Sequence, residues 1–213
     1  MTGRRARTFA MLLPWAKAAV RQCAVGFLAS LAILVWLMPR DDSIEIPVSI
    51  PVAAVDSFTW EEQRRAFGER LERGYGLDEA VADEFAGWIL EASTRQHLQP
   101  ELIASLVMTE STFRKHARSP SGAVGPTQVR PDLWREFCGV DPLDPEQNIY
   151  CGAQILAHYR DACAGHTDTP EEAEACALRS YNVGYNNHDN AWFDKAAQRY
   201  VAKIDRYLDP IEA

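Results

Sequence analysis

The chain of 213 residues is 47% hydrophobic and 24% charged, which suits one well-cored domain with an appendage rather than two full domains. Its first 40 residues contain six basic and no acidic residues, so the rest of the chain carries a net charge of −14 against −8 for the whole. Such an acidic body repels nucleic acid phosphates, and we therefore exclude nucleic acid as a partner.

Near the N-terminus, residues 22–39 form an uncharged run, QCAVGFLASLAILVWLMP, close to the length with which a helix crosses a bilayer. Basic residues precede the run and Asp41 and Asp42 follow it, which predicts a cytoplasmic tail over residues 1–21 and a periplasmic remainder. A buried core helix would show a polar face, and a cleaved signal peptide would offer small residues at its end. We therefore expect an uncleaved, single-pass inner-membrane anchor, followed by an extended linker over residues 40–57 that is rich in Pro and β-branched residues.

From residue 58 onward helical periodicity dominates, and no run alternates as a strand does, so residues 58–213 are predicted to form a mainly α globular domain. Asp144 and Thr169 each precede a proline, a pattern typical of a capped helix start. The expected helices lie at residues 60–73, 77–97, 100 to about 112, 131–137, 145–163, 170–182 and 190–208.

Four cysteines lie in the acidic part of the chain, at Cys138, Cys151, Cys163 and Cys176. An even number in an exported domain predicts two disulfides, although the sequence alone leaves three connectivities open. Cys163, near one expected helix end, and Cys176, early in the next helix, would staple a helical hairpin, which favours that pair and leaves Cys138 with Cys151. No Cys-x-x-Cys pair and no histidine at ligand spacing is present, so we expect no metal site.

The helix that begins at Pro100 carries Ile103, Leu106 and Val107 on one face, and Glu110 continues that apolar stripe. A carboxyl group placed toward the core or into a cleft has a raised pKa, because burial disfavours its charged form. A carboxylic acid that stays protonated near neutral pH can protonate a leaving oxygen, as the general acid of glycoside cleavage does. The alternative is a frayed helix end from which Glu110 reaches water.

Four segments in order, TESTF, ARSPSGAVGPTQVRP, DPEQNIYCGAQIL and ALRSYNVG, resemble the motifs of lytic transglycosylases with an SLT-type domain, relatives of goose-type lysozyme. The resemblance covers about residues 88–208 and implies a lysozyme-like fold. It implies Glu110 as the sole catalytic acid and base, Ser111 as its hydrogen-bonding neighbour, Gln128 in the sugar cleft, a Tyr181 hydroxyl on the carboxylate, Asn182 in binding, and Asn148 with Ile149 as a structural pair.

The glycine-rich loop departs from the family pattern. Gly-Leu-Met-Gln of relatives is here Gly125, Pro126, Thr127 and Gln128, which removes apolar bulk expected beneath the saccharide and puts the subsite shape in doubt. Four aromatic residues, Trp134, Tyr185, Trp192 and Phe193, either stack on sugar rings or pack in the core.

The resemblance further implies cleavage of the β-1,4 bond between N-acetylmuramic acid and N-acetylglucosamine in peptidoglycan, with formation of a 1,6-anhydro ring and without metal or organic cofactor. Two alternatives stay open. A hydrolytic muramidase would need a second carboxylate, for which Asp132, Glu136 and Asp189 are the candidates. The other alternative is a non-catalytic glycan-binding or scaffold component of an envelope-spanning secretion or conjugation machine. The anchor and the altered loop motivate it, and such a protein would not cleave the glycan.

Overall fold

The computed structural model describes residues 59–212. The expected tail, anchor and linker at residues 1–57 lie outside these residues. Within residues 59–212, no helix combines the length and the apolar character that crossing a membrane requires.

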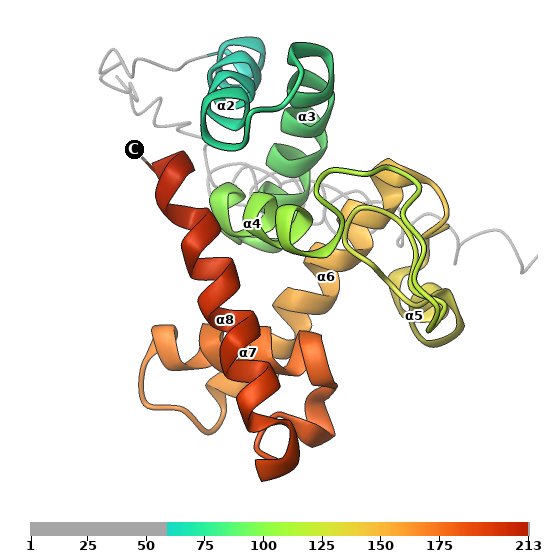
Figure 1. Cartoon of the computed structure of the whole chain (residues 1–213), viewed down its shortest axis with the longest axis vertical. Coiled ribbons are helices and arrows are strands. Elements are labelled where there is room, and N and C mark those ends of the chain that lie inside the picture. The colour runs from blue at the N-terminus through green and yellow to red at the C-terminus, as the bar shows by residue number, and fades with distance from the viewer. Residues whose placement is uncertain (1–58, 213) are drawn as a thin grey trace, which may run out of the picture. The chain divides into compact units, whose positions relative to one another are not determined.

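The described part of the chain is built from α-helices (Figure 1). In order, these are α2 (Trp60–Tyr75), α3 (Glu79–Gln96), α4 (Pro100–Glu110), α5 (Pro131–Cys138), α6 (Pro145–Ala164), α7 (Pro170–Val183), the 3-10 helix η1 (Tyr185–Asn187) and α8 (Ala191–Glu212). The only β-type pairing recorded for the described residues is a pair of isolated bridges, Arg118 with Val124 and Val124 with Val129. The mainly α prediction is confirmed.

Local sequence fixes where several helices start. Thr59 and Glu62 form a reciprocal capping box at the start of α2. Asp144 and Thr169 accept hydrogen bonds from the backbone N–H of the third residue of α6 and α7, and in both helices a proline follows the cap. The two helices therefore begin at the predicted residues and each runs one residue beyond the predicted end.

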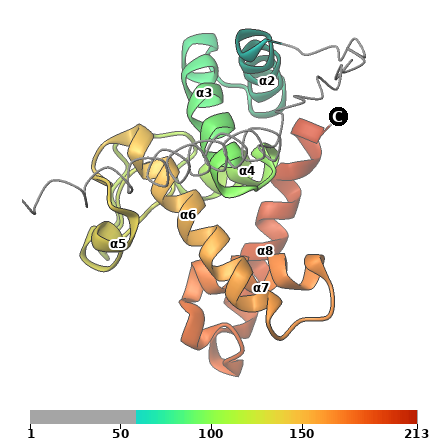
Figure 2. The same ribbon diagram turned by 180° about the vertical axis from the view of Figure 1, so that it is seen from behind.

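The core lies where α4 meets its neighbours. α4 packs against α3 and α8, α6 pairs with α7 and also packs on α3, and α8 contacts α2, α4 and α7. Figure 2 shows α6 crossing the molecule between the α2 and α3 pair and α7. The fully buried large side chains include Phe67, Leu71, Phe85, Ile89, Ile103, Leu106, Ile149, Leu156 and Ile204. The predicted apolar stripe of α4 is thus in the core.

Two disulfides reinforce this packing, and both are the pairs that the sequence favoured. Cys138–Cys151 joins α5 to α6, and Cys163–Cys176 joins α6 to α7. Cys163, His166 and Cys176 lie close together, but both sulfurs are committed to the disulfide and neither is available as a thiolate ligand.

Candidate active site

Glu110 is the last residue of α4, and the chain turns away directly after it. Ser111 caps the helix, and Thr112 and Phe113 adopt left-handed backbone angles, with φ of 52° and 60°. Phe113 is 5% exposed and packs edge-on against Phe85 in the core. Burial of Phe113 stabilises this turn, so Glu110 ends a helix that is fixed in place rather than frayed.

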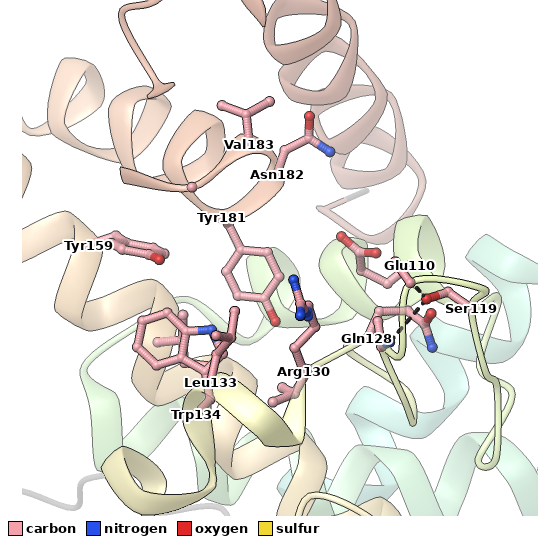
Figure 3. A pocket seen from close by; sticks show the side chains of 15 residues that line it. Glu110, Ser119, Gln128, Arg130, Leu133, Trp134, Tyr159, Tyr181, Asn182 and Val183 are labelled. Atoms are coloured by element: carbon pink, nitrogen blue, oxygen red, sulfur yellow. Dashed lines mark hydrogen bonds between the residues drawn. The ribbon is translucent and has the colours of Figure 1, made fainter. Parts of the chain in front are cut away.

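The Glu110 carboxyl group lines a cleft of about 480 Å³, a volume typical of ligand sites (Figure 3). One side of the cleft is polar, with Ser119 and Gln128 beside Glu110, and the other is aromatic, with Trp134 and Tyr159. The full lining consists of Glu110, Ser119, Ser121, Ala123, Gln128, Val129, Arg130, Leu133, Trp134, Ile155, Tyr159, Tyr181, Asn182, Val183 and Gly184. A polar and an aromatic wall facing each other suit a sugar ring, which has polar edges and apolar faces.

Two residues of α8 hold the end of α4. The Tyr200 hydroxyl donates a hydrogen bond of 2.5 Å to Glu110 Oε1, and the Lys203 ammonium donates to the Thr109 carbonyl at 2.8 Å. Tyr200 is 8% exposed. A cation at the last turn of a helix interacts favourably with the unpaired carbonyls there. α8 therefore fixes both the backbone and the carboxyl group of the candidate acid.

The electrostatic environment keeps Glu110 protonated to higher pH than usual. Burial raises the pKa of the Glu110 carboxyl, and the Tyr200 hydrogen bond and the Lys203 charge oppose this rise without cancelling it. Burial and the nearby Glu110 charge raise the pKa of the Tyr200 and Tyr181 hydroxyls, so both phenols remain donors. The site thus holds a carboxylic acid with one oriented hydrogen-bond donor.

The hydrogen bond to the carboxylate comes from a different tyrosine than the one that the resemblance implied. The Tyr181 hydroxyl donates to the Thr127 carbonyl at 2.9 Å, while Tyr200 contacts Glu110. Tyr181 therefore supports the loop that carries Gln128 and not the carboxyl group. Tyr200 is not among the site residues predicted from the sequence. This residue shares a helical spacing with Phe193, Ala197 and Ile204, and a tyrosine on a buried helix face requires a hydrogen-bond partner, which is the signal by which Tyr200 can be found.

The loop that carries Gln128 is held by buried Asn148. The Asn148 amide donates to the Val124 carbonyl at 2.9 Å and to the Pro142 carbonyl at 2.8 Å, and its oxygen accepts from the Thr127 N–H at 2.9 Å. Gly125, with φ of 74°, packs so closely that a Cβ there would lie 2.4 Å from Asn148. Asn148 therefore satisfies backbone groups that a buried loop would otherwise leave unpaired.

Thr127 is part of the same network, which gives the departure from the family loop a structural reason. It is fully buried, and its hydroxyl reaches the Asn148 carbonyl at 2.9 Å. The hydroxyl also occupies the space beside Gly152, where a Cβ would approach it to 2.4 Å. The Thr127 side chain is thus packed between the loop and α6 and does not line the cleft.

The other predicted site residues divide into two groups. Gln128 and Asn182 line the cleft, Gln128 with a left-handed backbone (φ of 53°) and its amide nitrogen 2.9 Å from the Gly125 carbonyl. Such backbone angles in a residue other than glycine occur frequently at functional sites. Ser111 is buried, and its hydroxyl donates to the Val107 carbonyl at 3.2 Å. Ser111 therefore ends the helix and does not contact the Glu110 carboxyl group.

Glu110 is the only acidic residue among the described residues that line the cleft. The candidate second carboxylates are not among these lining residues: Asp132, at the start of α5, pairs with Arg130, Glu136 lies further along α5, and Asp189 pairs with His188. Of the four aromatic candidates, Trp134 lines the cleft, whereas Trp192 is 86% exposed outside its lining.

Comparison with known proteins agrees with this geometry. The model of the transglycosylase SLT domain family matches residues 87–204. Similar proteins include a transglycosylase of Enterobacteria phage PRD1, 37% identical over 118 residues (55% of this chain, 40% of the relative). Membrane-bound lytic murein transglycosylase F of Vibrio parahaemolyticus is 29% identical over 174 residues (73% and 30%), and transglycosylase F 2 of Alkalilimnicola ehrlichii is 37% identical over 95 residues (44% and 21%). The match thus spans less than half the length of each of these curated relatives.

Proposed function

The chain belongs to the transglycosylase SLT domain family, and we propose that it is a lytic transglycosylase that cleaves the β-1,4 bond between N-acetylmuramic acid and N-acetylglucosamine in peptidoglycan. The observation that carries the proposal is Glu110, the single acidic side chain that residues 59–212 contribute to the cleft lining, with its raised pKa and its hydrogen bond from Tyr200. Relatives named as murein transglycosylases support the choice of polymer.

In the proposed mechanism Glu110 acts first as acid and then as base. Its carboxyl proton passes to the glycosidic oxygen as the bond to the anomeric carbon breaks. The acetamido carbonyl oxygen of the substrate attacks the anomeric carbon from the other face, which removes the need for a carboxylate nucleophile. The Glu110 carboxylate then takes the proton of the muramoyl 6-hydroxyl, whose oxygen displaces the acetamido oxygen and closes the 1,6-anhydro ring.

The geometry of the cleft supports one carboxylate rather than two. A hydrolase that uses two carboxylates places them about 5 to 9.5 Å apart across the scissile bond. Asp132, Glu136 and Asp189 are absent from the cleft lining, as described above. We therefore propose intramolecular ring closure, with Tyr200 orienting the carboxyl group in both halves of the reaction.

We further propose that the domain acts in the periplasm from an inner-membrane anchor at residues 22–39. Support comes from the two disulfides, which form in oxidising compartments, and from the membrane-bound relatives. Association with a secretion or other cell-envelope machine stays a prediction, which rests on the anchor expected at residues 22–39.

The decisive test is digestion of purified sacculi by the full chain and by the Glu110→Gln variant, with mass spectrometry of the products. We expect anhydro-muropeptides from the wild type and a loss of at least about a thousandfold in the variant, because the proton donor is gone. Products heavier by one water would indicate a muramidase instead. Glycan binding without release of products, with both proteins alike, would indicate a scaffold and contradict the proposal.

The same variant has a built-in folding control. Glutamine keeps the shape of Glu110 but removes a carboxyl whose ionisation burial disfavours, so the variant should unfold at a temperature equal to or slightly above that of the wild type at neutral pH. Because the pKa of Glu110 is higher in the folded than in the unfolded state, the wild type loses stability as pH rises from the unfolded-state pKa through the folded-state pKa. Below both pKa values the carboxyl is neutral in both states and costs nothing. Any difference in unfolding temperature should therefore disappear near pH 4.

A further inference from the structure

Arg130 is the only cationic residue among the described residues that line the cleft. It is the residue before Pro131, and its extended backbone (φ of −91°, ψ of 107°) is the conformation that a following proline favours. In Figure 3 its guanidinium points into the cleft, between Tyr181 and Glu110 in that view. The start of α5 thus presents a positive charge to whatever occupies the cleft.

The fold does not depend on this arginine. Its recorded ion pair is with Asp132, two residues further along, with Nη2 and Oδ2 2.6 Å apart and Nε and Oδ1 3.3 Å apart. The two side chains are 45% and 57% exposed. Exposed ion pairs contribute little to stability, and this pair joins no second element of the fold. The ion pair therefore orients the guanidinium, and exchanging Asp132 for another carboxylate would cost the fold little free energy.

Lys203 shows what a cation with a structural role looks like here. Its ammonium is bound to the Thr109 carbonyl of another helix, and its charge acts on the Glu110 carboxyl group. Arg130 has neither kind of contact, since its ion-pair partner, Asp132, lies only two residues further along the chain. This contrast assigns Arg130 to the recognition of a bound molecule rather than to the acid.

The proposed substrate carries the matching charge. A muramoyl residue bears a lactyl group that ends in a carboxylate when no peptide is attached, and otherwise bears a peptide with carboxylates of its own. The acidic body of the protein repels such groups, so a cation inside the cleft offsets that repulsion locally. A guanidinium fork also fits a carboxylate with two parallel hydrogen bonds, which an ammonium does not.

We propose that Arg130 determines substrate specificity by binding a carboxylate of the muramoyl residue or of its peptide, and that Asp132 holds the guanidinium in place until the substrate carboxylate displaces it. The inference rests on the proposed function, because it takes the occupant of the cleft to be peptidoglycan. It adds to that function a residue that reads the charge of the substrate rather than the sugar ring.

The test compares kinetics of the full chain on two soluble glycan strands, one with intact peptides and one from which an amidase has removed them. A third, neutral strand, with its lactyl carboxylates converted to methyl amides, serves as a competitive inhibitor. For Arg130→Gln we expect KM to rise about tenfold or more on at least one anionic strand, the cost of a lost charge-assisted contact. The inhibition constant of the neutral strand should stay unchanged, and the anionic strand that is affected identifies the source of the carboxylate.

Two variants sharpen the result and one controls it. Arg130→Lys should keep part of the affinity, and Asp132→Asn should lower KM because it removes the competing carboxylate. Arg135→Gln removes the same charge five residues further along, on α5, where Arg135 pairs with Asp141 outside the cleft lining. This control should leave KM unchanged.

Two results would overturn the inference: an unchanged KM for Arg130→Gln on both anionic strands, or an equal loss for Arg135→Gln. If the wild type is active and the KM of Arg130→Gln equals that of the wild type, only this inference is contradicted. A wild type that releases no anhydro products contradicts the proposed function itself.

Discussion

The two sides of the cleft are built in different ways. On the acid side, two residues of α8 hold the end of α4. Tyr200 bonds Glu110, 90 positions earlier in the sequence, and Lys203 bonds the Thr109 carbonyl, 94 positions earlier. On the α5 side, Leu133 lies on a short helix whose only buried residue is Cys138. Arg130 directly precedes this helix and pairs with Asp132, two residues further along.

This difference suggests a division of tasks. Proton transfer requires a carboxyl group whose pKa and direction are fixed, and burial among distant elements of the fold supplies both. Recognition of a varied polymer requires surface that is exposed and free to exchange partners, which α5 offers, with Leu133 59% exposed. We therefore expect changes on the acid side to act on kcat, and changes on the α5 side to act on KM.

The largest effect on stability should come from removing the disulfide that fastens α5. The double variant Cys138→Ala and Cys151→Ala opens a link across 13 residues, and the free energy of unfolding should fall by about 3 kcal/mol. Because Cys138 is the one buried residue of α5, loosening this helix should also raise KM more than it lowers kcat. Denaturant unfolding and steady-state kinetics measure both. The division of tasks is wrong if kcat falls and KM stays the same.

Tyr200→Phe tests the acid side alone. It removes the hydrogen bond to Glu110, and kcat should fall by about tenfold to a hundredfold as the carboxyl group loses its orientation. The hydrogen bond lowers the pKa of Glu110, so its loss raises that pKa further. Glu110 can donate only while protonated, and the activity of the variant should therefore persist to higher pH than that of the wild type.

Tyr181→Phe is the matched control, since it removes a hydroxyl of the same kind that is bonded to the Thr127 carbonyl instead. In its pH–activity profile, the pH at which activity falls on the alkaline side should stay near that of the wild type. If both variants shift this pH equally, the assignment of Tyr200 to the carboxyl group is contradicted.

The smallest effect is expected for Leu133→Ala, which trims the exposed wall of α5. We expect KM to rise only a few fold and the free energy of unfolding to change by less than about 0.5 kcal/mol, because the side chain is already in contact with water. A kcat loss as large as that of Tyr200→Phe would show that α5 takes part in the chemistry.

The sequence predicted those features of the fold that depend on neighbouring residues. Helix starts at Pro145 and Pro170 follow from a capping side chain and a proline next to each other, and the structure has both. The burial of Ile103, Leu106 and Val107, and with it the inward direction of Glu110, follows from helical periodicity. The anchor and linker at residues 22–57 stay predictions.

Other features of the site required the tertiary structure. Tyr181 and Tyr200 lie on expected helices with apolar faces, and only the packing of α8 against α4 brings Tyr200 to the carboxyl group while Tyr181 reaches the Thr127 carbonyl. The place of Thr127 in the Asn148 network likewise depends on which surfaces face one another. So does the position of Arg130, the one cation in the part of the cleft lining that residues 59–212 form.

The sequence by itself thus determined where the helices lie, which face of α4 is buried and that Glu110 extends that face, because periodicity and capping are properties of residues a few positions apart. The tertiary structure decided which phenol holds the acid, which carboxylates stay outside the cleft and which cation faces it. Hydrogen bonds and electrostatic effects act over a few ångströms, and only the folded packing sets the distances between residues that are far apart in the chain.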